Sequence, residues 1–349
     1  MMRQTIAYTA FVTLLLTTAF AGCRREPLPS TGDPISFSVG TVGSALVTKA
    51  DEKPTAQEYL IKDGNQIAVW AERIISDTRS NVFDDSPVTV LCNQDGENFT
   101  WDYTGGNASK IKYWAQTGMY KFRSVFPTTA NVQSNTNSEE LVVYYSMHDD
   151  NYDLMVASAE VSTASRASSQ VPLIFHHACA ALRFYFTCDS DDPYYIKNFA
   201  LDNVRTIGLL TYWGTGETKV AVGEWALLYP QAPQVYQWIA EDDDHRWAVD
   251  KTTGYNTQWY FAIPQDLLES SNANPAVEFT YVNGYDQEIP AKLPLPLHYL
   301  DSGNVEHEVV WEPGKIYIYN IQLQPEKTTL TLTVEDWDQF YVSGGDIIF

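Results

Sequence analysis

The chain has 349 residues and a formal net charge of −22, with 22 Lys and Arg residues against 44 Asp and Glu residues. This acidic balance argues against nucleic acid as a partner and against charge-driven binding to anionic membranes. The length favours two domains. Tyrosine and tryptophan are common, at 22 and 10 residues, which favours β-sheets with aromatic faces.

Residues 1–22 have the pattern of a signal peptide. After a basic residue, a hydrophobic stretch runs from Ile6 to Phe20 and small residues follow it. This stretch is too short to be interpreted first as a membrane span. The sequence FAGC at 20–23 resembles a bacterial lipobox, although Phe20 stands where Leu is usual. We therefore expect Cys23 to be acylated and to begin the mature chain. The alternative is ordinary signal cleavage near Ala21, which would leave a secreted chain without lipid.

Residues 23–34 contain Pro and Gly without an apolar period, which predicts a lipidated tether. Next, Ile35, Phe37 and Val39 alternate with small or polar residues, a pattern typical of a half-buried strand. The following residues, 42–59, lose this alternation and predict a loop.

The rest of the chain is a succession of short apolar runs separated by turn residues, which predicts an all-β protein made of β-sandwiches. A Ser-rich stretch at 162–170 marks the expected boundary between an N-terminal domain at 35–165 and a C-terminal domain at 166–349. Run 171–188 is expected to be a strand with one apolar face formed by Ile174, Ala178, Ala180, Leu182, Phe184 and Phe186.

Cys92, Cys179 and Cys188 remain after the leader is removed. The last two would lie about 30 Å apart along a single strand at about 3.3 Å per residue, which is too far for a disulfide. We expect all three thiols to be reduced or buried.

Some residues have the types and spacing of metal or catalytic sites. Asp149, Asn151, Asp153 and Glu160 have the spacing of a calcium loop, but Leu154 stands where the turn needs Gly. An acidic turn that leads into a strand is therefore the preferred interpretation.

His176 and His177 are neighbours, and neighbours on a strand face opposite ways, so we expect core histidines rather than a metal or base pair. Motifs for nucleophilic, zinc or nucleotide chemistry are absent from the sequence. No enzymatic activity, cofactor or metal is expected. An extracellular hydrolase would need paired carboxylates or a nucleophile beside a base.

Six stretches, in this order, resemble the fimbrillin family, the Mfa-like pilus subunits of Bacteroidales. Each is weak alone, and together they span nearly the whole mature chain. They are FAGC at 20–23, DLMVA at 153–157, VPLIFHHACAALRF at 171–184, FAIPQDL at 261–267, WEPGKIYIYNIQL at 311–323 and TVEDW at 333–337.

The resemblance implies two transthyretin-like β-sandwich domains and export to the cell surface as an outer-membrane lipoprotein. It also implies cleavage after a basic residue in the loop that follows the first strand. Lys49, followed by Ala50, matches that position, where the family more often has Arg. Loss of the first strand would open a groove for a strand of the next subunit.

The chain also offers donor strands. Leu330, Leu332 and Val334 alternate with Thr, and the chain ends in Ile347, Ile348 and Phe349 after a pair of glycines. The alternative is that residues 330–334 are simply the last strand of this subunit.

These features predict a structural or adhesive subunit of a pilus, assembled with other pilus subunits and able to meet a host or bacterial surface ligand. The rival is a surface glycan-binding lipoprotein of the β-sandwich type. Exposed, coplanar Trp side chains would favour the rival, whereas burial of Trp70, Trp311 and Trp337 would disfavour it.

Overall fold

The computed structural model describes most of the chain between Gly32 and Asp336. The elements of this part are β-strands, numbered β1 to β26. Within it, no helix is long and apolar enough to cross a membrane. The described residues are 32–41, 60–84, 86–96, 98–103, 111–133, 140–148, 150–164, 170–212, 223–228, 234–237, 247–252, 254–268, 274–301, 303–324 and 328–336.

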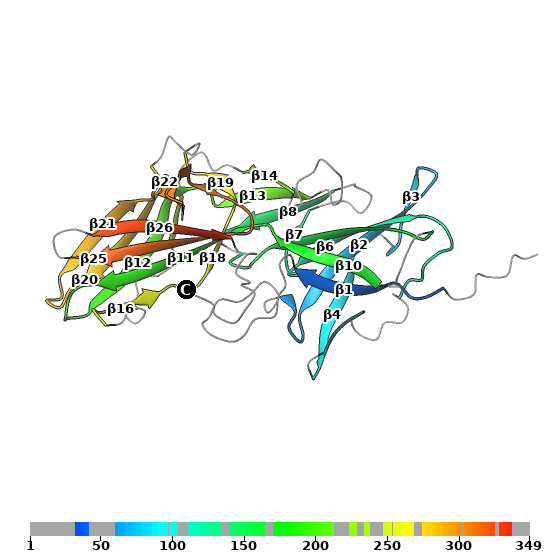
Figure 1. The fold of residues 1–349 in the computed structure, drawn as a ribbon, viewed down its shortest axis with the longest axis horizontal. Coiled ribbons are helices and arrows are strands. Elements are labelled where there is room, and N and C mark those ends of the chain that lie inside the picture. Colours follow the sequence, from blue (N-terminus) through cyan, green and yellow to red (C-terminus); the bar gives the residue numbers. More distant parts are fainter. Residues whose placement is uncertain are drawn as a thin grey trace, which may run out of the picture.

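The first sheet has eight strands and lies at the right of the molecule in Figure 1. Alternation of buried and exposed residues along its strands gives it one apolar face, as the period of two predicts. In spatial order the strands are β1 (Ser36–Thr41), β10 (Gln170–His177), β9 (Met155–Ser162), β6 (Met119–Phe126), β2 (Gln66–Ile75), β4 (Val88–Asp95) and β5 (Asn98–Tyr103), and β3 (Thr78–Asn81) pairs with β2.

The sheet curls, so that its two end strands, β1 and β5, approach each other. The ring of Phe37 on β1 lies 6.0 Å from the ring of Tyr103 on β5 and 6.1 Å from that of Phe122 on β6. These rings belong to a first hydrophobic core enclosed by the curled sheet.

Two further sheets pack face to face and form a β-sandwich at the left of Figure 1. Phe184 and Phe199 meet across this sandwich at 4.9 Å between ring centres, and Phe186 meets Phe279 at 5.4 Å. One sheet is β17 (Tyr255–Asn256), β11 (Ala180–Cys188), β25 (Lys315–Leu323) and β26 (Thr329–Asp336), with β18 (Tyr260–Ala262) beside β11; the other is β15 (Gln234–Gln237), β12 (Tyr194–Val204), β20 (Ala276–Val282) and β21 (Glu288–Pro294), with β16 (Trp247–Val249) beside β12.

A smaller sheet lies between these two parts in Figure 1 and combines strands from both halves of the sequence. Leu141, Val143 and Tyr145 of β8 point into the second core, although they precede the first sheet's β9 in the chain. This sheet is β14 (Glu224–Leu227), β13 (Ile207–Tyr212), β8 (Leu141–Ser146) and β7 (Asn131–Val132); two short pairs are β19 (Gln265–Asp266) with β24 (Val310–Trp311) and β22 (His298–Leu300) with β23 (Glu306–Glu308).

The all-β, sandwich-type fold expected from the sequence is confirmed by this architecture. The expected boundary between residues 165 and 166 falls between β9 and β10, which are hydrogen-bonded neighbours in the first sheet. Residues 170–177 therefore pack with the strands of the first half.

The prediction of one strand over residues 171–188 is wrong, and so is the placement of Ile174 on its buried face. The run forms β10 and β11, which lie in different sheets and are separated at Ala178 and Cys179. Ile174 is 44% exposed, because in β10 the inward positions are those of Val171 and its alternate neighbours. The other five predicted core residues of this run are buried.

Candidate functional site

The first strand is an integral part of the first sheet. β1 runs parallel to β10, in a register that places Ser36 beside Gln170 and Thr41 beside Phe175. Of the residues predicted to cover the core, Ile35 and Phe37 are 0% and 3% exposed, and Val39 is half-buried. The half-buried strand expected from the alternation of these residues is thus present, with sheet neighbours along its length.

The beginning of β1 is held by hydrogen bonds from two directions. The Ile35 amide donates to the Lys112 carbonyl at 2.8 Å, and the Tyr103 hydroxyl donates to the Ile35 carbonyl at 2.9 Å. Two residues before Ile35, the Asp33 carbonyl accepts a hydrogen bond from the Trp114 amide at 3.1 Å. Burial raises the pKa of the Tyr103 hydroxyl, so this group remains a protonated donor.

A groove of about 360 Å³ runs beside β1. Its walls are residues 36–39 of β1 and residues 99–102 of β5, and Ile61 and Gln170 complete it. Phe37 and Trp101 line it as nearly buried rings, whereas Phe99 is 40% exposed. The groove is therefore an aromatic slot between the two ends of the curled sheet.

The predicted donor segment at 330–334 lies in β26, which pairs antiparallel with β25 of the same chain. Leu330, Leu332 and Val334 are half-buried and pack against the second core, whereas the intervening threonines are exposed. In this structure the segment is the last strand of its own subunit and the end strand of its sheet.

The other predicted site residues lie outside the residues that the structure describes. These are the lipidation residue, the two residues of the cleavage site and the three apolar residues at the chain end: Cys23, Lys49, Ala50, Ile347, Ile348 and Phe349.

Of the calcium-like spacing, Asp149 lies outside the described residues, and the other three residues contact separate partners. Asp153 binds His177, with 2.7 Å between Oδ2 and Nδ1. Glu160 pairs with Lys121 at 2.9 Å on the surface of the first sheet. Among the described residues, no group of three or more His, Cys, Asp or Glu side chains could hold a metal ion.

Sequence patterns do not predict the Asp153–His177 pair, because its two residues lie 24 positions apart and belong to separate motifs. Both side chains are buried, at 1% exposure each. The pair links Asp153, two residues before the start of β9, to His177, the last residue of β10. His176 points the other way and is partly exposed, and burial together with the neighbouring His177 lowers its pKa. The opposite orientation of the two histidines agrees with the strand geometry expected from the sequence.

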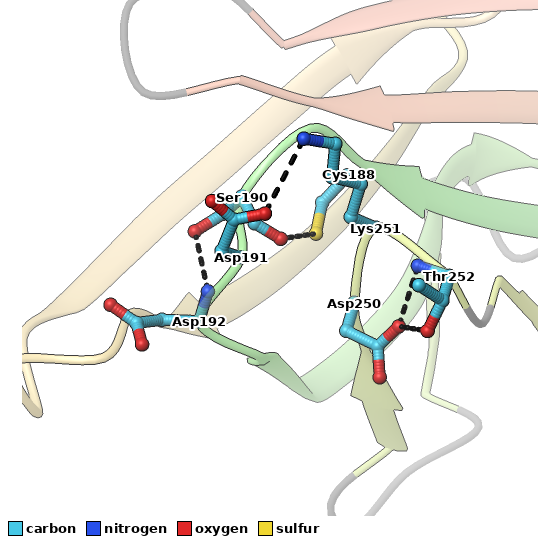
Figure 2. Close-up of polar contacts among 7 residues, drawn as sticks. All are labelled: Cys188, Ser190, Asp191, Asp192, Asp250, Lys251 and Thr252. Carbon is cyan, nitrogen blue, oxygen red and sulfur yellow. Dashed lines mark hydrogen bonds and ion pairs between the residues drawn. The ribbon is translucent and has the colours of Figure 1, made fainter.

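An acidic turn follows β11 and contacts the residues that follow β16, Asp250 to Thr252 (Figure 2). Lys251 Nζ lies 3.3 Å from Asp191 Oδ1, and the Asp250 carboxylate accepts hydrogen bonds from the Thr252 amide and hydroxyl at 2.7 Å. The thiol of Cys188 lies behind this turn, 3.4 Å from a backbone carbonyl. The carboxylates of Asp191 and Asp250 are thus bound by ammonium, amide and hydroxyl donors of Lys251 and Thr252, which follow β16.

All three described cysteines are free and buried. Burial and, secondarily, the charge of Asp63 raise the pKa of the Cys92 thiol to about 11. Burial also raises the pKa of Cys179 and Cys188. These thiols are therefore neutral core groups, as expected, and lack the lowered pKa of a nucleophile.

The glycan-binding alternative depends on the exposure of Trp70, Trp311 and Trp337. Trp311 is fully buried, and its Nε1 donates to the Tyr319 hydroxyl at 2.9 Å. Trp70 is half-buried, and Trp337 lies outside the described residues. The burial of Trp311 speaks against a stacking platform at that position.

The fold and the site define an all-β, sandwich-type protein whose first strand covers a core at the end of a curled sheet. The model of the family described as "Fimbrillin-like" matches residues 48–337, and the chain belongs to this family. Fimbrillins are structural subunits of pili, so this chain is a pilus subunit of the cell surface that assembles with other pilus subunits.

Two solved structures to which this chain is similar come from Bacteroides species. A candidate cell adhesion protein from Bacteroides uniformis is 14% identical, with a TM-score of 0.53 over 87% of this chain and 98% of its own. A fimbrial protein from Bacteroides vulgatus is 12% identical, with a TM-score of 0.49 over 87% of this chain and 99% of its own. A search of curated proteins finds no match.

Proposed function

We propose that the chain is a structural pilus subunit exported as a lipoprotein, acylated at Cys23, and joined to the next subunit by strand exchange. In this proposal a protease cuts after Lys49, β1 leaves, and a strand of a second subunit takes its place. The observation that carries the proposal is the position of β1: it covers the first core, yet it is an end strand joined to the rest of the sheet by a single neighbour, β10. The family match begins at residue 48, so β1 lies outside it.

Removal of β1 has a definite physical cost. Ile35 and Phe37 are buried, and each contributes roughly 1.5–3 kcal/mol through apolar burial. Their loss would uncover the core and leave the edge of β10 without a partner, a state that favours pairing with another strand. Cleavage would therefore convert a stable monomer into a subunit that requires a donor strand.

The test is cleavage of the purified mature chain with a trypsin-like protease. Within residues 42–59 the other basic residue, Lys53, precedes Pro54 and is a poor site for such a protease, so Lys49 is the expected cut. We expect a ladder of multimers on a native gel after cleavage, and none with the Lys49→Ala variant. If residues 24–49 are lost and the product stays monomeric, the strand-exchange proposal fails.

The lipid anchor has a separate test. Mass spectrometry of the N-terminal peptide from isolated membranes should show acylated Cys23 as the first residue. The Cys23→Ser variant should lose this modification and leave the membrane fraction, since buried acyl methylenes contribute about 0.8 kcal/mol each. An unmodified N-terminus near residue 21 would support ordinary signal cleavage instead.

A further inference from the structure

Residues 112–114, which we call the strap, lie beside residues 33–35, the residues that directly precede β1. Two backbone hydrogen bonds of 2.8 and 3.1 Å join the two segments, one donated by each of them. Between these bonds Pro34 lies opposite Tyr113 in an antiparallel bridge. β1 itself pairs in parallel with β10. Two separate partners, the strap and β10, therefore hold this part of the chain.

The strap is fixed to the first core by contacts that do not involve β1. Trp114 is 5% exposed, and its ring meets the ring of Tyr120 on β6 edge-on, with 4.9 Å between the ring centres. The Tyr120 hydroxyl accepts a hydrogen bond from the Ala115 amide at 3.1 Å. Lys112 Nζ lies 2.6 Å from Asp84 Oδ2. The position of the strap therefore does not depend on a covalent link between β1 and the rest of the chain.

The two backbones also approach each other closely at Gly32. A Cβ atom at this position would lie 2.5 Å from the carbonyl oxygen of Trp114, a distance that packed Cβ atoms do not adopt. At Gly40, within β1, a Cβ atom would make an ordinary contact of 3.5 Å with the end of the Ile174 side chain. Only the first of these glycines is required for contact with the strap.

A cut after Lys49 breaks none of these contacts. The strap contacts residues 32–35, and the pairing with β10 ends at Thr41, so both lie on the N-terminal side of the cut. Ile35 and Phe37 remain buried in the first core as long as these contacts stay closed. Because apolar burial and backbone pairing favour association, the cut N-terminal fragment is a peptide ligand of the rest of the chain.

We propose that the strap retains the N-terminal fragment, residues 23–49, after cleavage, so that the cut and the release of β1 are separate steps. This inference rests on the proposed function. The partner of the strap is a peptide of this same chain, bound through its backbone as an added strand. Because acylated Cys23 and β1 belong to the same fragment, the cut subunit stays at the membrane until β1 is released.

The experiment uses the purified mature chain with Cys23→Ser, cut by a trypsin-like protease at high dilution, where exchange between subunits is slow. Gel filtration at intervals separates bound from free fragment, and mass spectrometry identifies the fragment that ends at Lys49. We expect this fragment to elute with the rest of the chain in native buffer and apart from it in urea.

The matched variants are Gly32→Ala and Gly40→Ala, which place the same substitution on the same fragment. Gly32→Ala should shorten the half-life of the retained fragment at least tenfold, because its Cβ atom pushes the Trp114 carbonyl away. Gly40→Ala should retain the fragment as the parent does. Equal rates of loss from the two variants would overturn the role of the strap.

Retention itself is overturned if the fragment of the parent chain elutes separately as soon as the chain is cut. If multimers then form, strand exchange stands and only the retention falls. The proposed function fails in a different way. Its failure would appear as a Gly32→Ala chain that has lost the fragment and forms no multimers at high protein concentration.

Discussion

His177 Nδ1 and Asp153 Oδ2 lie 2.7 Å apart in the interior of the protein, where the chain leaves the first sheet. His177 is the last residue of β10 and pairs in register with Met155 at the start of β9. One residue further on, the chain enters the second core at Ala178. The pair therefore holds the point at which the two cores meet.

The Asp153→Ala change should lower the free energy of unfolding by about 3–5 kcal/mol, because removal of one member of a buried polar pair leaves the other without its partner. Urea unfolding measures this loss. The matched control is Asp191→Ala, since that carboxylate lies at the surface in its contact with Lys251 and should change stability little. Equal effects of the two changes would contradict a stabilising role for the buried pair.

The Phe37→Ala change should destabilise the chain by about 3–5 kcal/mol, since it removes a buried ring and leaves a cavity in the first core. Thermal unfolding and the rate of proteolysis near β1 would both report the effect. Ser38→Ala, on the exposed side of the same strand, should leave both unchanged. An unchanged midpoint for Phe37→Ala would mean that β1 does not cover the core.

The Tyr103→Phe change should loosen the beginning of β1, because it deletes the hydrogen bond to the Ile35 carbonyl while keeping the ring. A loss of about 0.5–1.5 kcal/mol is expected for one such bond. Hydrogen exchange of residues 35–41 should become faster, with other strands of the sheet less affected. Tyr113→Phe is the control, as Tyr113 is 48% exposed. Equal protection of residues 35–41 in the two variants would contradict the role of the hydroxyl.

The cysteines should resist alkylation in the native chain. With its pKa raised to about 11, Cys92 has only about one thiolate in a thousand molecules at pH 8. Mass spectrometry after iodoacetamide treatment should show modification of Cys92, Cys179 and Cys188 only under denaturing conditions. Rapid modification of any of them in the native chain would contradict the buried state.

The same pKa shift has a consequence for stability. The folded pKa of Cys92 lies above the ordinary value of 9.0, so the folded chain binds the proton more tightly than the unfolded chain does. Its contribution to stability is complete below pH 9 and is lost as the pH rises towards about 11. Urea midpoints across this window should fall less steeply in a Cys92→Ala variant.

Local patterns were enough to predict the first strand. The alternation of Ile35, Phe37 and Val39 predicted a half-buried strand, and Ile35 and Phe37 are buried in the structure. This works because the side-chain period of a strand is a property of consecutive residues, independent of what packs on them.

Run 171–188 shows what local sequence patterns cannot predict. Its apolar residues are continuous, so the sequence offers no sign that β10 ends at His177 and that β11 starts a different sheet. A break of this kind changes which residues face inward, and Ile174 was therefore placed on the wrong side. Local patterns do not predict the Asp153–His177 pair either, since its members come together only when β9 and β10 pair.

The amino-acid sequence by itself determined the all-β class and the resemblance to fimbrillins, because each depends on short-range patterns or on motifs; the export leader at residues 1–22 stays a prediction. Only the tertiary structure decided that β1 pairs in parallel with β10, that β8 joins β13 from the second half, and that a groove lies between β1 and β5. These relationships join residues far apart in the chain, and the free energy that selects them comes from burial of shared apolar surface, which no local pattern specifies.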